Sequence, residues 1–528
     1  MGVYVNPGNQ GFREMLRSDY VDKTGMIALI NETLETTRKL TCVSRPRRFG
    51  KTFAAKMLCA YYDYTCDSRS LFDSLEIAKS SDYLTFLNKY MVIYIDISGF
   101  TSMLRVENGS IENLLPTIQE SIRKELLQTY PYLDESEPLP ACMLRCVKEE
   151  DRKIVFIIDE WDAPIRESTD TSIHSAYLDL LRSWFKNSNL TPKVTAAAYM
   201  TGILPIRKDG SQSAISDFIE YPILYPDGYA SYTGFTESDV RLLCDSFGCD
   251  FTAAKKWYDG YHFSGCESIY NPFSVMQAMH NRTFRSYWQK TSAAESLTAY
   301  INLDFDGLQD VTARLIAGEA IEVDADGFEN DFTSFKNRDD VLTLLVHLGY
   351  LSYDEGSQTV RIPNLEVGME FKKLLKSNSK NDNWVRLITQ SRKLLEDTLS
   401  GDETAVAAGI DSVRCSEYAP TYYNDEQALR YVVKFAYIAG LDQYTRLEEL
   451  PSGRGIADVV FLPKKHSALP ALIVELKWNK SADGAIAQIK DRNYPAVLMD
   501  YGGEIILAGI NYDEKRKQHK CKIERINR

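Results

Sequence analysis

Short apolar runs alternate with longer amphipathic stretches through roughly the first 225 residues of the chain. The runs have the length and composition of buried strands, and the stretches between them have helical spacing. Strands are expected at Leu40–Val43, Met91–Ile97, Ile154–Ile158 and Val194–Thr201. Helices are expected between them, for example at Ile111–Leu127 and Ser172–Trp184. This alternation predicts a parallel α/β sheet over about residues 35–225, and the loop-rich stretch Tyr221–Tyr232 predicts its end.

The pattern changes in the rest of the chain. Short helices are expected at Glu237–Phe247, Thr252–Asp259 and Pro272–Met279. An apolar helix at Asp340–Leu348 then leads into a hairpin that ends with Thr359–Ile362, and a helix plus hairpin of this size is typical of a winged helix. A helical region over about residues 383–440 precedes an α/β end domain. Strands of that domain are expected near Val459–Leu462, Ala471–Trp478 and Ile505–Gly509.

Composition places the chain among ordinary globular proteins, with 528 residues, 44% hydrophobic and 26% charged. No apolar run approaches the roughly 18–20 residues of a membrane span. The amino terminus has no basic region followed by an apolar stretch, and the ten cysteines are scattered, so we expect a cytoplasmic location and reduced thiols. The net charge of −13 argues against a surface built for general nucleic-acid binding. Residues 420–528 are slightly basic by contrast.

A phosphate-binding loop is expected at Arg45–Thr52, between the first strand and the next helix. Gly50 would let the backbone approach phosphate, Lys51 would reach the β- and γ-phosphates, and the Thr52 hydroxyl would bind Mg²⁺. The first glycine of the usual Gly-x-x-x-x-Gly-Lys-Ser/Thr pattern is replaced by Arg45. Three arginines in one short loop repel one another unless acids or an anion lie among them. We expect ATP to bind through Arg47, Arg48, Phe49, Gly50, Lys51 and Thr52.

The second half of an ATPase site is indicated by Ile154–Ile158 and the acids that follow it. Asp159 is expected to hold Mg²⁺ together with Thr52, and Glu160 to orient or deprotonate the attacking water. Thr201, at the end of the fourth run, takes the place of a polar residue that senses the γ-phosphate. Arg166 or Arg207 could stabilise charge in the transition state, and the spacing does not select between them.

A second constellation lies in the end domain. Asp458 stands on one expected strand, and Glu475 and Lys477 stand on the next. Because side chains alternate along a strand, Glu475 and Lys477 share a face. A metal-dependent nuclease of the restriction-enzyme-like class needs this set, with Asp458 and Glu475 holding Mg²⁺ and Lys477 steadying the attacking water. All three are therefore candidate catalytic residues.

With both constellations in view, the chain resembles a bacterial family that joins an AAA-ATPase-like amino-terminal domain to a PD-(D/E)xK nuclease superfamily domain. The resemblance covers nearly the whole chain, and in that family an arginine at the position of Arg45 looks normal. The residues that carry it are Tyr20–Thr24, Arg45–Thr52, Asp159-Glu160, Tyr258–Tyr261, Tyr270–Phe273 and the set Asp458, Glu475 and Lys477.

The expected fold is therefore α/β, with a P-loop NTPase parallel sheet, a helical and winged-helix middle region, and a carboxyl-terminal restriction-endonuclease-like α/β domain. The resemblance and the patterns together imply domains at residues 1–230, 231–380 and 381–528. The oligomeric state stays open.

The leading functional hypothesis is an ATP-binding and ATP-hydrolysing protein whose ATPase domain controls a Mg²⁺-dependent nuclease. In the alternative, ATP drives a regulatory switch, and the end domain binds nucleic acid or a partner without cleaving it. A third hypothesis is an interaction protein in which both sites are inactive. The expected partners are ATP and nucleic acid, with DNA favoured over RNA, and no membrane.

Overall fold

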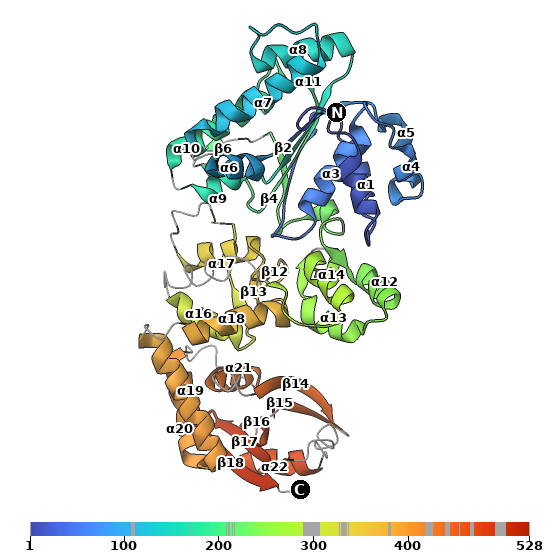
Figure 1. Cartoon of the computed structure of the whole chain (residues 1–528). Helices are drawn as coiled ribbons and strands as arrows, with labels where there is room; N and C mark the ends of the chain where they lie inside the picture. Colours follow the sequence, from blue (N-terminus) through green and yellow to red (C-terminus); the bar gives the residue numbers. More distant parts are fainter. Residues whose placement is uncertain are drawn as a thin grey trace. The chain divides into compact units, whose positions relative to one another are not determined.

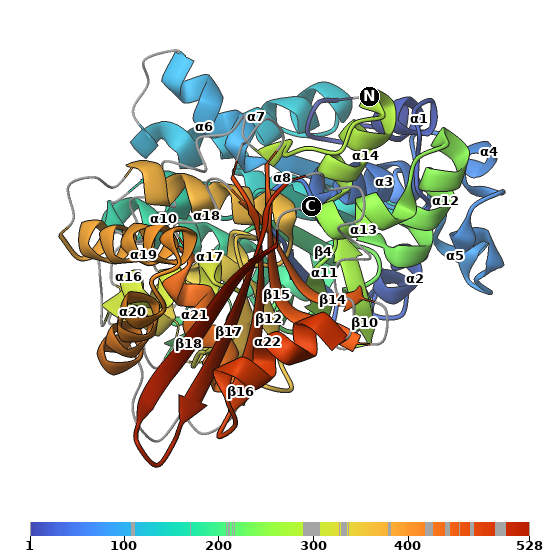
Figure 2. The same cartoon turned by 90° about the horizontal axis from the view of Figure 1, so that it is seen from below.

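Figures 1 and 2 show the helices and strands of the computed structural model. The chain divides into two compact units. The amino-terminal unit comprises Met1–Ser292 and Glu322–Val367, and the carboxyl-terminal unit comprises Ala293–Ile321 and Gly368–Arg528. The structure describes residues 2–106, 111–168, 170–206, 208–209, 212–213, 215, 217–263, 265–288, 307–326, 328, 335, 337–377, 382–417, 426–438, 444–452, 455–464, 469–491 and 503–526. Domain boundaries at residues 230 and 380 stay predictions.

A parallel sheet of five strands, in the order β2-β3-β4-β1-β7, forms the centre of the amino-terminal unit. The strands are β1 (Leu40–Ser44), β2 (Met91–Asp96), β3 (Ile154–Asp159), β4 (Thr195–Gly202) and β7 (Ile219–Tyr221). The predicted α/β class and parallel sheet are confirmed. β7 was not expected, because its three residues lie at the edge of the stretch that the sequence marks as a loop.

Helices cover both faces of this sheet (Figure 1). Alternate strand residues supply the two cores, since Ile154, Phe156 and Ile158 face one side while Val155 and Ile157 face the other. One face is covered by α6 (Ile97–Val106), α7 (Leu114–Thr129), α8 (Leu139–Glu150), α9 (Ala163–Glu167), α10 (Thr171–Phe185) and α11 (Thr191–Val194). The other is covered by α1 (Gln10–Leu16), α2 (Met26–Asn31), α3 (Lys51–Tyr62), α4 (Arg69–Phe72) and α5 (Tyr83–Phe86).

Residues 231–288 and 337–367 of the amino-terminal unit are called the middle region below. Its helices are α12 (Glu237–Phe247), α13 (Phe251–Tyr258), α14 (Pro272–Asn281) and α17 (Arg338–His347). Its strands are β8 (Phe235–Thr236), β9 (Tyr261–Phe263), β10 (Cys266–Tyr270), β12 (Ser352–Asp354) and β13 (Thr359–Arg361). Local signals set several ends, since Thr236 and Asp239 form a capping box on α12 and Asn271 caps α14. The expected hairpin is present as β12 and β13, and the winged-helix assignment stays a prediction.

The carboxyl-terminal unit contains a mixed sheet in the order β14-β15-β16-β17-β18. Only β16 and β17 are parallel, and α22 forms the crossover between them. The strands are β14 (Tyr444–Ser452), β15 (Gly455–Pro463), β16 (Ala471–Trp478), β17 (Ile505–Asp513) and β18 (Gln518–Ile526). The helices are α16 (Leu308–Ile316), α18 (Leu365–Ser377, which begins in the amino-terminal unit), α19 (Asp382–Ser400), α20 (Glu403–Glu417), α21 (Glu426–Ala436) and α22 (Ala482–Asp491). The three expected strands fall in β15, β16 and β17, while β14 and β18 were not expected.

Several short elements complete the described chain. They are η1 (Glu76–Lys79), η2 (Ile111–Asn113), β5 (Lys208–Asp209), β6 (Gln212–Ser213), η3 (Asp227–Tyr229) and β11 (Ile321–Glu322). Within the described ranges, no helix has both the length and the apolar character to cross a membrane.

Candidate functional site

The predicted phosphate-binding loop joins β1 to α3 and ends at Gly50, whose φ of +90° lies in the left-handed region. A Cβ there would meet no atom of the described chain within 4 Å, so the backbone conformation rather than crowding favours glycine. α3 starts at Lys51, and no side chain of the described residues caps it. Its first backbone N–H groups and the positive end of its dipole can therefore bind an anion.

Arg45, which stands in place of the first loop glycine, is completely buried. Its Nε donates to Thr233 Oγ1 at 2.6 Å, and its Nη1 donates to the carbonyls of Ser44 and Tyr221 at 2.7 Å each. Burial lowers the pKa of Arg45 to about 10. This arginine joins β1, β7 and the start of the middle region, so its role in the loop is structural.

The next loop residues contact the middle region. Arg48 lies over the Phe273 ring at 4.0 Å and donates to the Tyr287 carbonyl at 3.2 Å. Phe49 packs edge-on against Tyr261 with ring centroids 5.2 Å apart. Arg48 and Phe49 thus face the middle region, whereas Arg47 is exposed and close enough to lower the pKa of Glu160.

Two of the motifs that carry the family resemblance support this contact. Gly260 has a φ of +122°, and a Cβ there would fall 1.8 Å from the Pro363 carbonyl oxygen. The next residue, Tyr261, donates its hydroxyl to the Gly349 carbonyl at 2.7 Å. Gly349 in turn lies against Pro46 of the loop, since a Cβ at Gly349 would fall 2.8 Å from the proline ring. Tyr258–Tyr261 and Tyr270–Phe273 therefore hold the phosphate-binding loop from the middle region.

The acidic half of the site lies at the carboxyl edge of the sheet, where Asp96, Asp159 and Thr201 form one row across β2, β3 and β4. Burial raises the pKa of Asp159 to about 6, and a hydrogen bond from Thr52 opposes that rise. The Thr201 hydroxyl donates to the Val43 carbonyl at 3.0 Å. Sequence reasoning missed Asp96, although the run that ends in it has the same form as the run that ends in Asp159.

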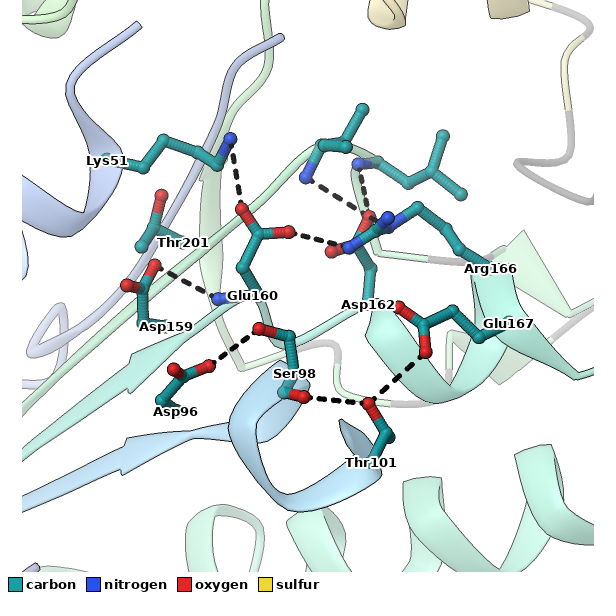
Figure 3. Close-up of polar contacts among 12 residues, drawn as sticks. Lys51, Asp96, Ser98, Thr101, Asp159, Glu160, Asp162, Arg166, Glu167 and Thr201 are labelled. Atoms are coloured by element: carbon teal, nitrogen blue, oxygen red, sulfur yellow. Dashed lines mark hydrogen bonds and ion pairs between the residues drawn. The ribbon is translucent and has the colours of Figure 1, made fainter. Parts of the chain in front are cut away.

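Glu160 follows β3 directly and has a φ of +51°, a conformation that is strained for a residue with a side chain. Its Oε1 lies 3.2 Å from Lys51 Nζ, and its Oε2 lies 2.6 Å from Arg166 (Figure 3). Although burial opposes the change, Lys51 and Arg166 hold the pKa of Glu160 below its ordinary value. Glu160 is therefore an ionised carboxylate held between two cations. Arg207, the other arginine considered, lies outside the described residues.

Part of the amino-terminal unit matches a known protein family. Residues 7–211 match the family described as "Predicted AAA-ATPase". The expected AAA-ATPase-like domain is confirmed. An "Uncharacterized protein in vnfD 5'region" from Azotobacter chroococcum mcd 1 is 24% identical over 530 residues, covering 96% of this chain and 95% of the relative.

Two solved structures have low structural and sequence similarity to the chain. The Aeropyrum pernix ORC2 protein, in ADPNP and ADP complexes, gives a TM-score of 0.33 at 11% identity, over 71% of this chain and 98% of that chain. Cdc6p from Pyrobaculum aerophilum gives a TM-score of 0.25 at 12% identity, over 67% of this chain and 93% of that chain.

The residues of the AAA-ATPase-like domain fit a nucleotide with its magnesium ion. The uncapped start of α3 and the buried Lys51 provide donors for phosphate. Thr52, the second residue of α3, and Asp159, the last residue of β3, offer two oxygens, the atom type that Mg²⁺ prefers.

In the carboxyl-terminal unit, the three predicted residues of the second site lie together. The register that pairs Val459 with Val474 brings Asp458 opposite Glu475, and an oxygen of Asp458 accepts from the Leu476 N–H at 2.8 Å. Lys477 donates to Glu475 Oε1 at 3.0 Å. All three side chains are buried.

Two residues outside the set Asp458, Glu475 and Lys477 complete the second site. Arg430, on α21, forms an ion pair of 2.6 Å with Asp458, and Gln488, on α22, donates to Glu475. Each acid is therefore paired with a donor. The described residues contain no group of three His, Cys, Asp or Glu side chains that could hold a metal ion. Two buried carboxylates still fit Mg²⁺, which usually completes its shell with water and substrate oxygens.

Proposed function

We propose that the AAA-ATPase-like domain binds ATP with Mg²⁺ and hydrolyses it. The observation that carries this proposal is the ion pair between Lys51 and Glu160, which directly precede Thr52 and directly follow Asp159 in the chain, respectively. Bound Mg²⁺ would neutralise phosphate charge. Lys51 and the amides at the start of α3 hold the phosphates, Arg47 is the exposed cation of the loop, and Thr52 with Asp159 holds the metal.

Glu160 is the proposed base of this reaction. It takes a proton from a water molecule whose oxygen bonds to the γ-phosphorus while the bond to the β-phosphate oxygen breaks and ADP departs. Arg48 and Phe49 support the loop from the middle region, and Thr201 fixes the row of strand ends beside β1.

Nucleotide binding and phosphate release test this proposal. We expect Lys51→Ala to abolish ATP binding, because it removes the buried cation at the start of α3. Lys56→Ala is the matched control, since Lys56 is exposed on the same helix. Unchanged ATP affinity in Lys51→Ala would reject the phosphate-binding assignment.

We further propose that the carboxyl-terminal unit is a PD-(D/E)xK nuclease-like domain that acts on DNA. The order of α21, β14, β15, β16, α22 and β17 supports this, because it places an acid on one strand and Glu-x-Lys on the next beside a crossover helix. Asp458 and Glu475 would hold Mg²⁺, and Lys477 would steady the attacking water. We expect DNA cleavage with Mg²⁺ or Mn²⁺ that Glu475→Ala removes and Glu514→Ala, an exposed control, leaves intact.

ATP turnover would control this cleavage, so Lys51→Ala should alter it although Lys51 belongs to the other unit. A specific observation favours the alternative function, a regulatory switch that binds nucleic acid or a partner without cutting. Arg430 pairs with Asp458, and Lys477 pairs with Glu475. Both cations therefore compete with a metal ion for these carboxylates. Absence of cleavage with either metal, with or without ATP, would select the switch.

A further inference from the structure

Arg166 holds the carboxylate of Glu160 from the side opposite Lys51 (Figure 3). Arg166 lies on α9, and its side chain is only 7% exposed. Its Nη2 bonds Glu160 Oε2 at 2.6 Å, and its Nε bonds Asp162 Oδ2 at 2.8 Å. The planar guanidinium therefore joins two carboxylates at fixed geometry, which lysine cannot reproduce.

Asp162 anchors this arginine to the end of β4. The Asp162 side chain is fully buried, and its Oδ2 also accepts from the backbone N–H groups of Ile203 at 3.1 Å and Leu204 at 2.9 Å. A Cβ at Gly202 would fall 2.6 Å from Asp162 Oδ1, so glycine is required for this close approach. The support of Glu160 thus extends into rigid backbone.

We propose that Arg166 is a positioning residue for ATP hydrolysis, which holds Glu160 Oε2 so that Oε1 is the oxygen that takes the proton of water. This rests on the proposed ATPase function. When Lys51 turns to phosphate, Oε1 loses its partner while Oε2 keeps Arg166. Because Arg166 is buried and bonded to two acids, it does not extend toward transferring phosphate or toward a second subunit.

The test separates binding from turnover in the full-length chain. In Arg166→Gln we expect kcat to fall about 30- to 100-fold. This is less than the full effect of a positioned base, roughly 10²–10⁴-fold, because Glu160 itself remains. The affinity for a fluorescent ATP analogue, measured by equilibrium titration, should change less than threefold, because Arg166 does not contact phosphate. Arg166→Lys should restore part of kcat, and methylguanidinium should restore part of it in Arg166→Ala. Arg105→Gln is the matched control, since Arg105 pairs with Glu167 of the same helix but is 60% exposed.

Three results would overturn the proposal. The first is an unchanged kcat in Arg166→Gln, and the second is a loss of ATP affinity in that variant as large as its loss of kcat. The third is that neither Arg166→Lys nor methylguanidinium added to Arg166→Ala restores any kcat. If Arg166→Gln does not fold, as judged by its melting temperature without nucleotide, the comparison of Arg166→Lys with wild type decides, and an equal kcat overturns the proposal. Wild-type protein that binds ATP but releases no phosphate would reject the ATPase function itself and this inference with it.

Discussion

Lys51 Nζ lies 3.2 Å from Glu160 Oε1, so the first residue of α3 and the first residue after β3 form an ion pair in the proposed nucleotide site. Lys51 is 5% exposed and also donates to the Pro46 carbonyl at 3.2 Å. Each charged group satisfies the other in the protein without nucleotide, because an unpaired buried charge is costly. In the proposed reaction, phosphate binding therefore requires Lys51 to exchange the Glu160 carboxylate for a phosphate, which links the proposed binding residue to the proposed base.

This exchange gives Glu160→Gln opposite effects on binding and turnover. The neutral amide no longer competes for Lys51, so we expect ATP to bind about 3- to 10-fold more tightly, the effect of losing a charge-assisted contact worth roughly 1 kcal/mol. Phosphate release should fall by about 10²–10⁴-fold, because the base is removed. Titration with labelled nucleotide and a single-turnover assay measure the two effects. Glu167→Gln is the control, and weaker binding in Glu160→Gln would contradict the competition.

The Tyr258–Tyr261 motif should be sensitive to one methyl group. Gly260→Ala places a Cβ 1.8 Å from the Pro363 carbonyl oxygen, so backbone must move. We expect the free energy of unfolding of the amino-terminal unit to fall by about 3 kcal/mol or more, from overpacking together with a strained φ. Gly248 has a smaller positive φ, +66° against +122° at Gly260, and nothing within 4 Å in the described chain, so Gly248→Ala should lose only about 1–2 kcal/mol. Urea unfolding measures both losses, and equal losses would contradict the predicted overpacking against Pro363.

His347 predicts a pH dependence of stability. Burial lowers its pKa from 6.5 to about 3, so the folded protein keeps His347 neutral while the unfolded chain takes up a proton below pH 6.5. Because the unfolded state then binds more protons, stability falls as the pH falls below 6.5, by up to about 1.4 kcal/mol per unit. Urea unfolding between pH 6.5 and pH 5 should show this slope in wild type and a smaller slope in His347→Phe. If an NMR titration of the folded protein gave His347 a pKa near 6.5, His347 would not cause this pH dependence.

Arg430 should weaken metal binding at the second site. Its ion pair with Asp458 is 2.6 Å long and mostly buried, so a cation must compete with the guanidinium for that carboxylate. We expect Arg430→Met to bind Mn²⁺ several-fold more tightly than wild type in calorimetric titration, with Asp458→Asn losing most of the binding. Arg516→Met is the control, because Arg516 is exposed on the β17–β18 hairpin. Weaker binding in Arg430→Met would show that the arginine helps to build the site.

Local sequence determined the elements that carry the chemistry. β3 followed by Asp159 and Glu160, Gly50 before a helix that starts with Lys51, and Glu475-x-Lys477 on one strand face all follow from patterns only a few residues long. The strand period and the turn residues are local properties of the sequence, so these arrangements can be predicted from it. The parallel sheet followed from the alternation of such elements.

Only the tertiary structure decided which of these side chains meet. Arg45 resembles its loop neighbours in sequence but is buried against Tyr221 and Thr233, far along the chain. Arg48 turns to Phe273, and Arg166 turns inward to Glu160. The charge of an arginine does not show whether it binds phosphate, a carboxylate or a carbonyl, because that depends on partners that folding brings near. Burial and pairing are properties of the folded chain, and they separated the structural arginines from the exposed Arg47.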